Sequence, residues 1–148
     1  MADKNKELIA LSENPATRFW KVNFQELSKP EQVFVCVWEL EAQVNNGGFE
    51  QYFHNSSGDN AQSVVAALQS IGANLTAGIV ERAIGVFGSN GPSPDESQRQ
   101  AVVENLSEEQ KEVWNKLDAE FFRYPNNLTE LLHDFVMKNR NQIQGLTR

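Results

Sequence analysis

A chain of 148 residues has the size of one domain, and its 40% of hydrophobic residues excludes an intrinsically disordered protein. Thirteen basic residues against twenty acidic ones give a net charge of −7. This charge argues against direct nucleic-acid binding, because phosphate contacts need a basic surface. No apolar run approaches the length of a membrane span, and the first residues lack the apolar segment of a signal peptide. We therefore expect one cytoplasmic domain over residues 1–148.

The first 27 residues are expected to form two short segments that pack onto the core. Residues 4–12 have the pattern of a short helix, with Leu8, Ile9 and Leu11 on its apolar side. Residues 17–27 carry aromatic side chains without a regular period, which is typical of a short helix or turn that docks on a core.

Residues 30–45 are predicted to form a buried helix around which the rest of the chain is organised. Its apolar stripe follows the helical period and consists of Val33, Val37, Leu40 and Val44. Ser28 and Glu31 have the spacing of a capping box, which would start this helix. Gly47 and Gly48 would end it.

Polar residues interrupt the apolar face of this helix near its end. At about 100° per residue, Glu41 falls on the buried side and Asn45 follows one turn later, whereas Glu39 is expected at the surface. A buried carboxylate needs donors. We expect the backbone N–H groups of residues 48–51, together with the amide of Asn45 or Asn46, to supply them. These residues either lock a helix–turn–helix corner, line a pocket for a ligand or partner, or catalyse a reaction. The corner is the simplest interpretation.

The segment after the two glycines is predicted to be a short helix over residues 49–54. It would present Phe49, Tyr52 and Phe53 to the core. Asp59 is expected to be the N-cap of the next helix, which would close at Gly72. A further helix is predicted over residues 76–87, where Gly78 and Gly85 imply a close approach of a neighbouring helix.

Three more helices are predicted in the last third of the chain. Ser93 would cap the first, which runs to about residue 105. Ser107 would cap the second, whose buried stripe is Val113, Trp114, Leu117 and Phe121. The last begins within residues 127–130. Since no alternating strand pattern is present, the expected fold class is all-α, as a single compact domain of about seven to nine helices.

Motifs of the common enzyme classes are absent from the sequence. Glu50 and His54 could hold a metal together with Asp59, but a surface pair explains their spacing more simply. The single cysteine, Cys36, lies in an apolar run and is expected to be a buried structural thiol. We therefore expect a protein that is not an enzyme and that has no cofactor and no metal.

The stretch WELEAQVNNGGFEQYFHNSSGD, from Trp38 to Asp59, resembles the bacterial DNA-mimic protein family, a group also described as a domain of unknown function. Its candidate corner or pocket residues are Glu41, Asn45, Asn46, Gly47, Gly48, Phe49, Gln51, Tyr52, Phe53, Asn55 and Asp59. The resemblance implies an all-helical, acidic homodimer. It also implies a carboxylate surface like the one with which the characterised member replaces DNA phosphates and binds a DNA-binding regulator. We interpret the shared motif as the scaffold of the fold and not as the mimicking surface.

The candidate partner-binding surface lies in a second acidic block, residues 95–120. Carboxylates at i and i+4 on a helix are about 6 Å apart along its axis, similar to the phosphates of one DNA strand. Glu108 and Glu112 have this spacing, although Glu112 and Lys116 could equally form an ordinary ion pair. The flanking candidates on the preceding helix are Asp95, Glu96 and Glu104.

Two functional hypotheses follow from these patterns. In the first, the protein is an acidic interaction module that acts as a DNA mimic: it binds a basic DNA-binding protein, such as a transcription regulator, and blocks its DNA site. In the second, it binds a small ligand or a peptide in a polar pocket around Glu41, Asn45, Asn46 and Gln51. Neither hypothesis involves a membrane or direct contact with nucleic acid.

Overall fold

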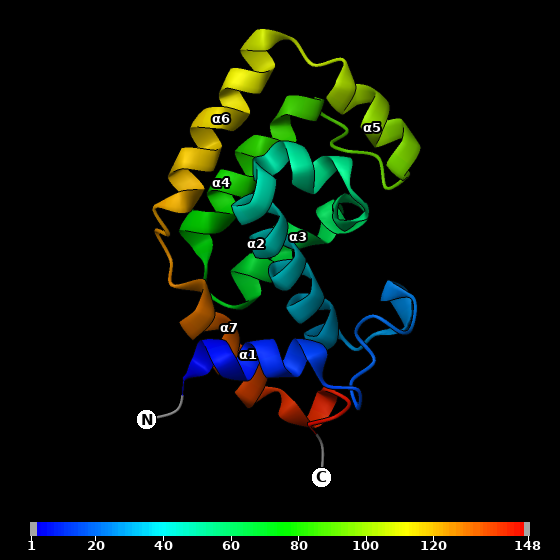
Figure 1. The fold of residues 1–148 in the computed structure, drawn as a ribbon, viewed down its shortest axis with the longest axis vertical. Helices are drawn as coiled ribbons and strands as arrows, with labels where there is room; N and C mark the ends of the chain where they lie inside the picture. Colours follow the sequence, from blue (N-terminus) through cyan, green and yellow to red (C-terminus); the bar gives the residue numbers. More distant parts are fainter. Residues whose placement is uncertain (1–2, 147–148) are drawn as a thin grey trace.

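Helix α2 runs through the middle of the molecule, and the other helices surround it (Figure 1). The structure, a computed structural model, describes residues 3–146. Within these residues it has no strand and seven α-helices: α1 (Lys4–Glu13), α2 (Lys29–His54), α3 (Ala61–Ser70), α4 (Asn74–Ile84), α5 (Glu96–Glu104), α6 (Glu108–Phe122) and α7 (Leu128–Lys138). Short 3₁₀ segments lie between and after them: η1 (Phe24–Glu26), η2 (Ser56–Asn60), η3 (Gly85–Phe87) and η4 (Arg140–Gln142). The all-α prediction is confirmed.

The start of α2 follows the predicted capping box. The Ser28 hydroxyl accepts the backbone N–H of Glu31, and the Glu31 carboxylate accepts the backbone N–H of Ser28. The predicted apolar stripe of α2 is buried in full: Val33, Val37, Leu40 and Val44. This stripe contacts helices on several sides, since α3, α5, α6 and α7 all pack on α2. Periodicity and capping therefore located the central element correctly.

The capping carboxylate of Glu31 has a second role, which the sequence did not indicate. Its side chain is 0% exposed, and Arg18 Nη2 lies 2.8 Å from its Oε1. Its Oε2 accepts the backbone N–H of Gln144 at 3.1 Å. Burial alone would raise the pKa of Glu31, but the hydrogen bonds from Arg18 and the backbone hold it below its ordinary value. Both ends of the described chain are thus attached to the start of α2.

Helices α1 and α7 lie side by side at one end of the molecule (Figure 1). Lys4 Nζ is 2.6 Å from Glu130 Oε1, and His133 Nε2 is 3.1 Å from Glu7 Oε1. Within residues 3–146, no helix has both the length and the apolar character that crossing a membrane requires.

The two glycines of the motif interrupt α2 without a loop. Gly47 has φ −155°, and Gly48 has φ 73° with ψ −174°, so the backbone leaves helical geometry at both residues. The segment after the kink buries Phe49, Tyr52 and Phe53, as predicted. Its first turn is capped from α6, because Asp118 Oδ1 accepts the backbone N–H of Phe49 at 2.8 Å.

Two predicted helix caps are wrong. The N-cap of α3 is Asn60, without a side-chain bond, because the carboxylate of Asp59 is bound elsewhere. The N-cap of α5 is Asp95 and not Ser93; its carboxylate accepts the backbone N–H groups of Ser97 and Gln98. The predicted cap Ser107 is confirmed and forms a capping box with Gln110.

Two packing predictions are also wrong. A Cβ at Gly78 or Gly85 would meet no atom within 4 Å in the described chain, so these glycines do not mark a close helix contact. Val113 is 43% exposed, whereas the rest of its predicted stripe is buried. The reason is the phase of α6: Trp114 is anchored by a hydrogen bond from its Nε1 to the Ala83 carbonyl, 2.9 Å away, which turns Val113 outwards.

Candidate partner-binding surface

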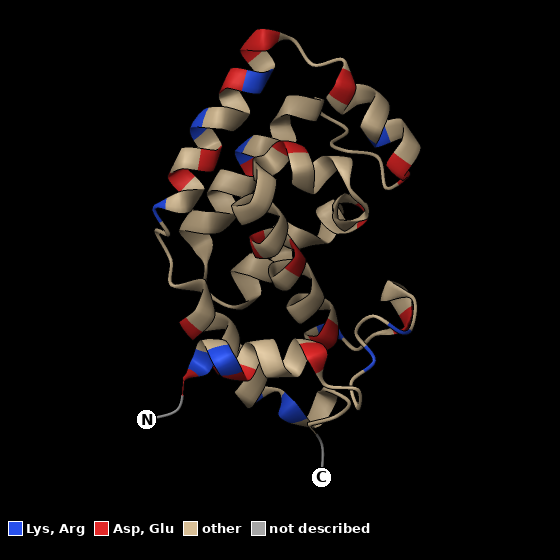
Figure 2. Cartoon of the chain, viewed as in Figure 1, with Lys and Arg blue, Asp and Glu red and all other residues tan. Residues whose placement is uncertain are grey.

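The charges are divided between two parts of the molecule (Figure 2). Residues 32–127, which form the body around α2 to α6, hold thirteen acidic and five basic residues. The rest of the sequence holds seven acidic and eight basic residues. Because α1 and α7 pack together, the basic residues that the structure describes near the two ends of the chain gather at one end of the molecule. The net negative charge therefore belongs entirely to the body.

The two central candidates, Glu108 and Glu112, are exposed on the first turns of α6. Within residues 3–146, neither carboxylate forms an ion pair, so the ordinary pair of Glu112 with Lys116 is not made. Glu109, which was not among the sequence candidates, is exposed beside them. Acids on the first turn of a helix are favoured by its dipole, so Glu108 and Glu109 are held there at low cost.

The three flanking candidates differ in whether their carboxylates are exposed and free to bind a partner. Glu104 is exposed at the end of α5, four residues before Glu108, and its Oε2 is 2.9 Å from His54 Nε2. Asp95 is occupied as the N-cap of α5, and Glu96 is half-buried. At 1.5 Å per residue, Glu96 and Glu104 are about 12 Å apart along the helix axis. We call Glu104, Glu108, Glu109 and Glu112 the acidic corner; Asp95 and Glu96 lie at the far end of α5.

The predicted donors to Glu41 are wrong: within residues 3–146 neither the amides of Asn45 and Asn46 nor the backbone N–H groups of residues 48–51 bond to its carboxylate. Its carboxylate is half-buried, and its Oε2 accepts a hydrogen bond from the Tyr124 hydroxyl at 2.8 Å. That hydroxyl in turn accepts one from Asn45 Nδ2 at 2.6 Å. The expected backbone donor at Phe49 is taken by Asp118 instead. Burial raises the pKa of Glu41, and the bond from Tyr124 opposes that shift.

The other polar residues of the motif form a separate network that joins the two sides of the kink. Asn46 Nδ2 donates to Gln51 Oε1 at 3.1 Å, and Gln51 Nε2 donates to Gln43 Oε1 at 2.8 Å. Asn55 Nδ2 donates to the same oxygen of Gln43 at 3.0 Å. The structure thus places Asn46 and Gln51 together, and Glu41 and Asn45 together. It does not join the four in the single pocket of the second hypothesis.

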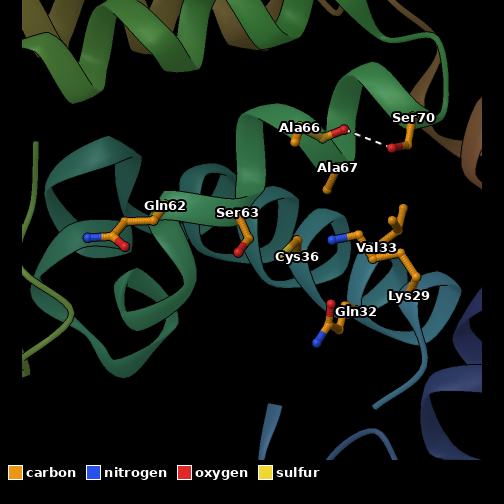
Figure 3. A pocket seen from close by; sticks show the side chains of 9 residues that line it. All are labelled: Lys29, Gln32, Val33, Cys36, Gln62, Ser63, Ala66, Ala67 and Ser70. Atoms are coloured by element: carbon orange, nitrogen blue, oxygen red, sulfur yellow. Dashed lines mark hydrogen bonds between the residues drawn. The ribbon is translucent and has the colours of Figure 1, made fainter. Parts of the chain in front are cut away.

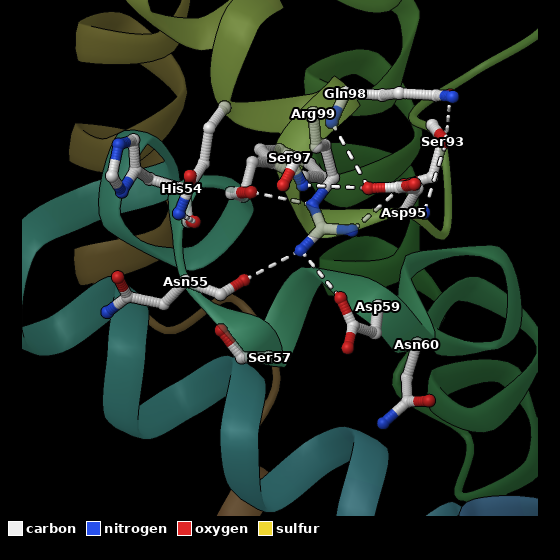
Figure 4. A network of polar contacts seen from close by, with 12 residues as sticks. His54, Asn55, Ser57, Asp59, Asn60, Ser93, Asp95, Ser97, Gln98 and Arg99 are labelled. Atoms are coloured by element: carbon white, nitrogen blue, oxygen red, sulfur yellow. Dashed lines mark hydrogen bonds and ion pairs between the residues drawn. The ribbon is translucent and has the colours of Figure 1, made fainter.

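Arg99 was not among the residues that the sequence pointed to, although it is the centre of a buried network (Figure 4). Its side chain is 0% exposed. It donates to the carbonyl oxygens of Phe53, Ser93 and Asn55 at 2.7, 2.9 and 2.8 Å. Its Nη2 also lies 2.8 Å from Asp59 Oδ1. This guanidinium attaches α5 to the end of the motif and thereby holds the acidic corner against α2.

Comparison with known protein families shows to which family the chain belongs. Residues 25–139 match the model of the DMP19-like protein family. The chain belongs to the DMP19-like family. The match extends from η1 past the end of α7 and includes the whole acidic body. No curated protein and no solved structure matches the chain. Since DMP19 proteins are DNA mimics, membership indicates a protein-interaction module of the DNA-mimic type.

A hollow of about 210 Å³ between α2 and α3 contains the single cysteine of this DMP19-like protein (Figure 3). Lys29 and Gln62 lie at its two ends, and Cys36 lies between them. The Cys36 side chain is buried, as predicted, and burial raises its pKa to about 12. The thiol is therefore protonated near neutral pH, which removes the thiolate that nucleophilic chemistry requires.

Glu39 was expected at the surface, and that prediction is wrong. Its side chain is half-buried against η2, where its Oε1 accepts a hydrogen bond from Asn60 Nδ2 at 3.2 Å. Burial raises the pKa of Glu39 to about 7, the bond from Asn60 opposes the rise, and the negative charge of Asp59 adds to it. The ionised form of Glu39 is consequently destabilised in the folded protein.

We expect the variant Glu39→Gln to be more stable than the wild type at pH 8, by about 1–2 kcal/mol, and equally stable at pH 4. The folded-state pKa lies above the ordinary value of 4.5, so the folded wild type binds this proton more tightly than the unfolded chain. Its stability therefore falls as the pH rises from about 5 to about 8, whereas glutamine keeps the acceptor without the charge. Urea unfolding at both pH values measures the difference.

The matched control is Glu112→Gln, which removes an exposed carboxylate. It should change stability by the same small amount, within about 0.5 kcal/mol, at both pH values. A gain in stability from Glu39→Gln that is the same at both pH values would contradict the conclusion that burial destabilises the ionised form of Glu39.

Proposed function

We propose that this DMP19-like protein is a non-catalytic DNA mimic whose acidic corner binds a basic DNA-binding protein, such as a transcription regulator, and excludes DNA from it. The observation that carries the proposal is the pair Glu108 and Glu112, one helical turn apart, exposed and without an ion pair within residues 3–146. Asp95 and Glu96 extend the surface along α5. The proposal includes the homodimer that the family resemblance implies.

The electrostatics of the surface support this role. A partner's Lys or Arg can reach Glu108 or Glu112 without first displacing a cation of this chain, so no existing pair has to be broken. The net charge of the whole body has the same sign, which increases the rate of encounter with a basic protein. Charge pairs at such an exposed surface are screened within about 10 Å at 0.1 M salt, so binding should weaken steeply as salt is added.

Competition with DNA is the expected result that tests the proposal. The partner is first isolated from a lysate of the source cells at low salt, and its complex with its own DNA is then titrated with this protein. The wild type should displace the DNA. The double variant Glu108→Gln, Glu112→Gln should need an at least tenfold higher concentration, since each lost charge pair with a partner cation contributes about 1 kcal/mol or more.

The control is a double variant of equal charge at the other end of the molecule, Glu13→Gln with Glu26→Gln, both exposed residues. This variant should displace DNA as well as the wild type does. The proposed function is wrong if DNA stays bound to the partner, or if both double variants behave alike. In the second case the effect comes from net charge and not from the acidic corner.

A further inference from the structure

A second hollow, of about 210 Å³, lies between α1 and α2, away from the acidic corner. We call it the indole hollow. It is lined by Asn5, Ile9, Trp38, Glu41, Ala42 and Asn45. Its lining thus combines an aromatic ring, a carboxylate, two amides and an apolar side chain, Ile9, that is 40% exposed. Cations are absent from this lining.

The indole is the end of a stacked aromatic column. The rings of Phe19 and Phe34 have centroids 4.5 Å apart, and those of Phe34 and Trp38 are 5.5 Å apart with planes inclined by only 13°. Phe34 therefore covers one face of the Trp38 indole, and Trp38 is held in a fixed orientation beside the hollow. Indole is the best of the aromatic rings for binding a cation.

The carboxylate of Glu41 is held in place but lacks a cation. Its Oε2 is fixed by Tyr124, the one non-glycine residue of the described chain with positive φ, at 50°. No donor within residues 3–146 reaches its Oε1, and no Lys or Arg of this part of the chain pairs with it. The fully buried carboxylate of Glu31 differs, because it has an arginine partner.

We propose that the indole hollow binds an arginine side chain of a protein partner. A planar guanidinium can stack on the indole and donate to Glu41 Oε1 at the same time, which a lysine ammonium does less well. The alkyl part of the side chain would lie against Ile9. The side chain belongs to a protein and not to free arginine, because the lining offers no cation for an α-carboxylate beside Glu41. This site does not depend on the acidic corner or on DNA mimicry.

Titration with N-acetyl-arginine-N-methylamide, followed through the backbone amide resonances of residues 41–45 in ¹⁵N NMR spectra of the wild type and of every variant, tests the proposal. We expect a Kd in the millimolar range for this single side chain. The citrulline analogue, which has the same shape without the charge, and free L-arginine should both bind at least about tenfold more weakly. The variant Glu41→Gln should lose at least about tenfold in affinity, and Trp38→Phe should lose severalfold.

Two controls separate this site from the proposed function. Glu39→Gln removes a carboxylate on another side of α2 and should bind the probe as the wild type does. The double variant Glu108→Gln, Glu112→Gln should also bind it unchanged, whatever its effect on DNA competition. Equal binding of the citrulline analogue, or an unchanged Kd for Glu41→Gln with a native amide spectrum, would overturn the proposal. If Glu41→Gln does not fold, unchanged binding by Trp38→Phe overturns it in the same way.

Discussion

Replacement of Arg99 by methionine is expected to lower the free energy of unfolding by about 3–5 kcal/mol, because one substitution removes four hydrogen bonds that a fully buried charged group donates. Methionine fills much of the space of the arginine stem but donates no hydrogen bond. Three backbone carbonyls and the carboxylate of Asp59 would lose the hydrogen bond from Arg99, and of these the Asn55 carbonyl keeps the backbone N–H of Gly58 (Figure 4). Gly58 packs against this guanidinium, since a Cβ at that position would lie 2.6 Å from Arg99 Nε. Equilibrium unfolding in urea measures the loss.

The matched control is Arg82→Met, because Arg82 also pairs with a carboxylate but has a side chain that is 57% exposed. An exposed pair of this kind contributes little, so the control should stay within about 1 kcal/mol of the wild type. The conservative variant Arg99→Lys should keep only a small part of the stability, since one ammonium cannot reach four acceptors at once. Equal losses for Arg99→Met and Arg82→Met would show that the buried network does not stabilise the fold.

The elements that the sequence predicted well are those determined by neighbouring residues. The stripe of α2 repeats every turn, and the caps at Ser28 and Ser107 involve residues three positions apart. The exposure of Glu108 and Glu112 was predicted for the same reason, because both lie opposite an apolar stripe on one helix. All-α architecture and the exposed part of the acidic corner therefore follow from local patterns.

The features that the sequence did not predict depend on residues far apart in the chain. Arg99 binds Asp59 forty positions away, and Asp118 caps a helix turn at Phe49, sixty-nine positions away. Since Asp59 and Asp118 could equally be solvated, a single sequence contains no sign of these pairs. Asp59 in particular has the local features of an N-cap, and the distant guanidinium takes its carboxylate away from that position.

Glu39 shows a different limit of helical periodicity. The apolar stripe of α2 correctly indicates one buried side, and a helix packed on one side only would leave Glu39 in solvent. However, α2 has neighbours on several sides, with η2 and α3 against one part of it and α6 against another. A central helix has no fully exposed face in its middle, so Glu39 becomes half-buried and its carboxylate titrates near neutral pH.

Gly48→Ala is expected to destabilise the protein by roughly 2–4 kcal/mol, through two separate effects. The combination of φ 73° and ψ −174° at Gly48 is a conformation that residues with a Cβ avoid, at a cost of about 1–3 kcal/mol. An alanine Cβ would also lie 2.4 Å from Asp118 Oδ2, which is too close for a carbon and an oxygen that are not bonded. Asp118 would have to move, and the buried N–H of Phe49 would lose its acceptor. Urea unfolding measures the total loss.

A second glycine in a helix provides a control of opposite sign. Gly78 lies within α4 in helical conformation, and a Cβ there would meet no described atom within 4 Å. Gly78→Ala should therefore stabilise the protein by about 0.5–1 kcal/mol through helix propensity alone.

The variant Asp118→Ala separates the two effects at the kink, because it removes the cap and the steric conflict but leaves the backbone conformation. In the Asp118→Ala background, Gly48→Ala should cost only the conformational part, about 1–3 kcal/mol. If Gly48→Ala costs nothing in either background, the kink does not require glycine, and the Asn-Asn-Gly-Gly turn is not the scaffold of this fold.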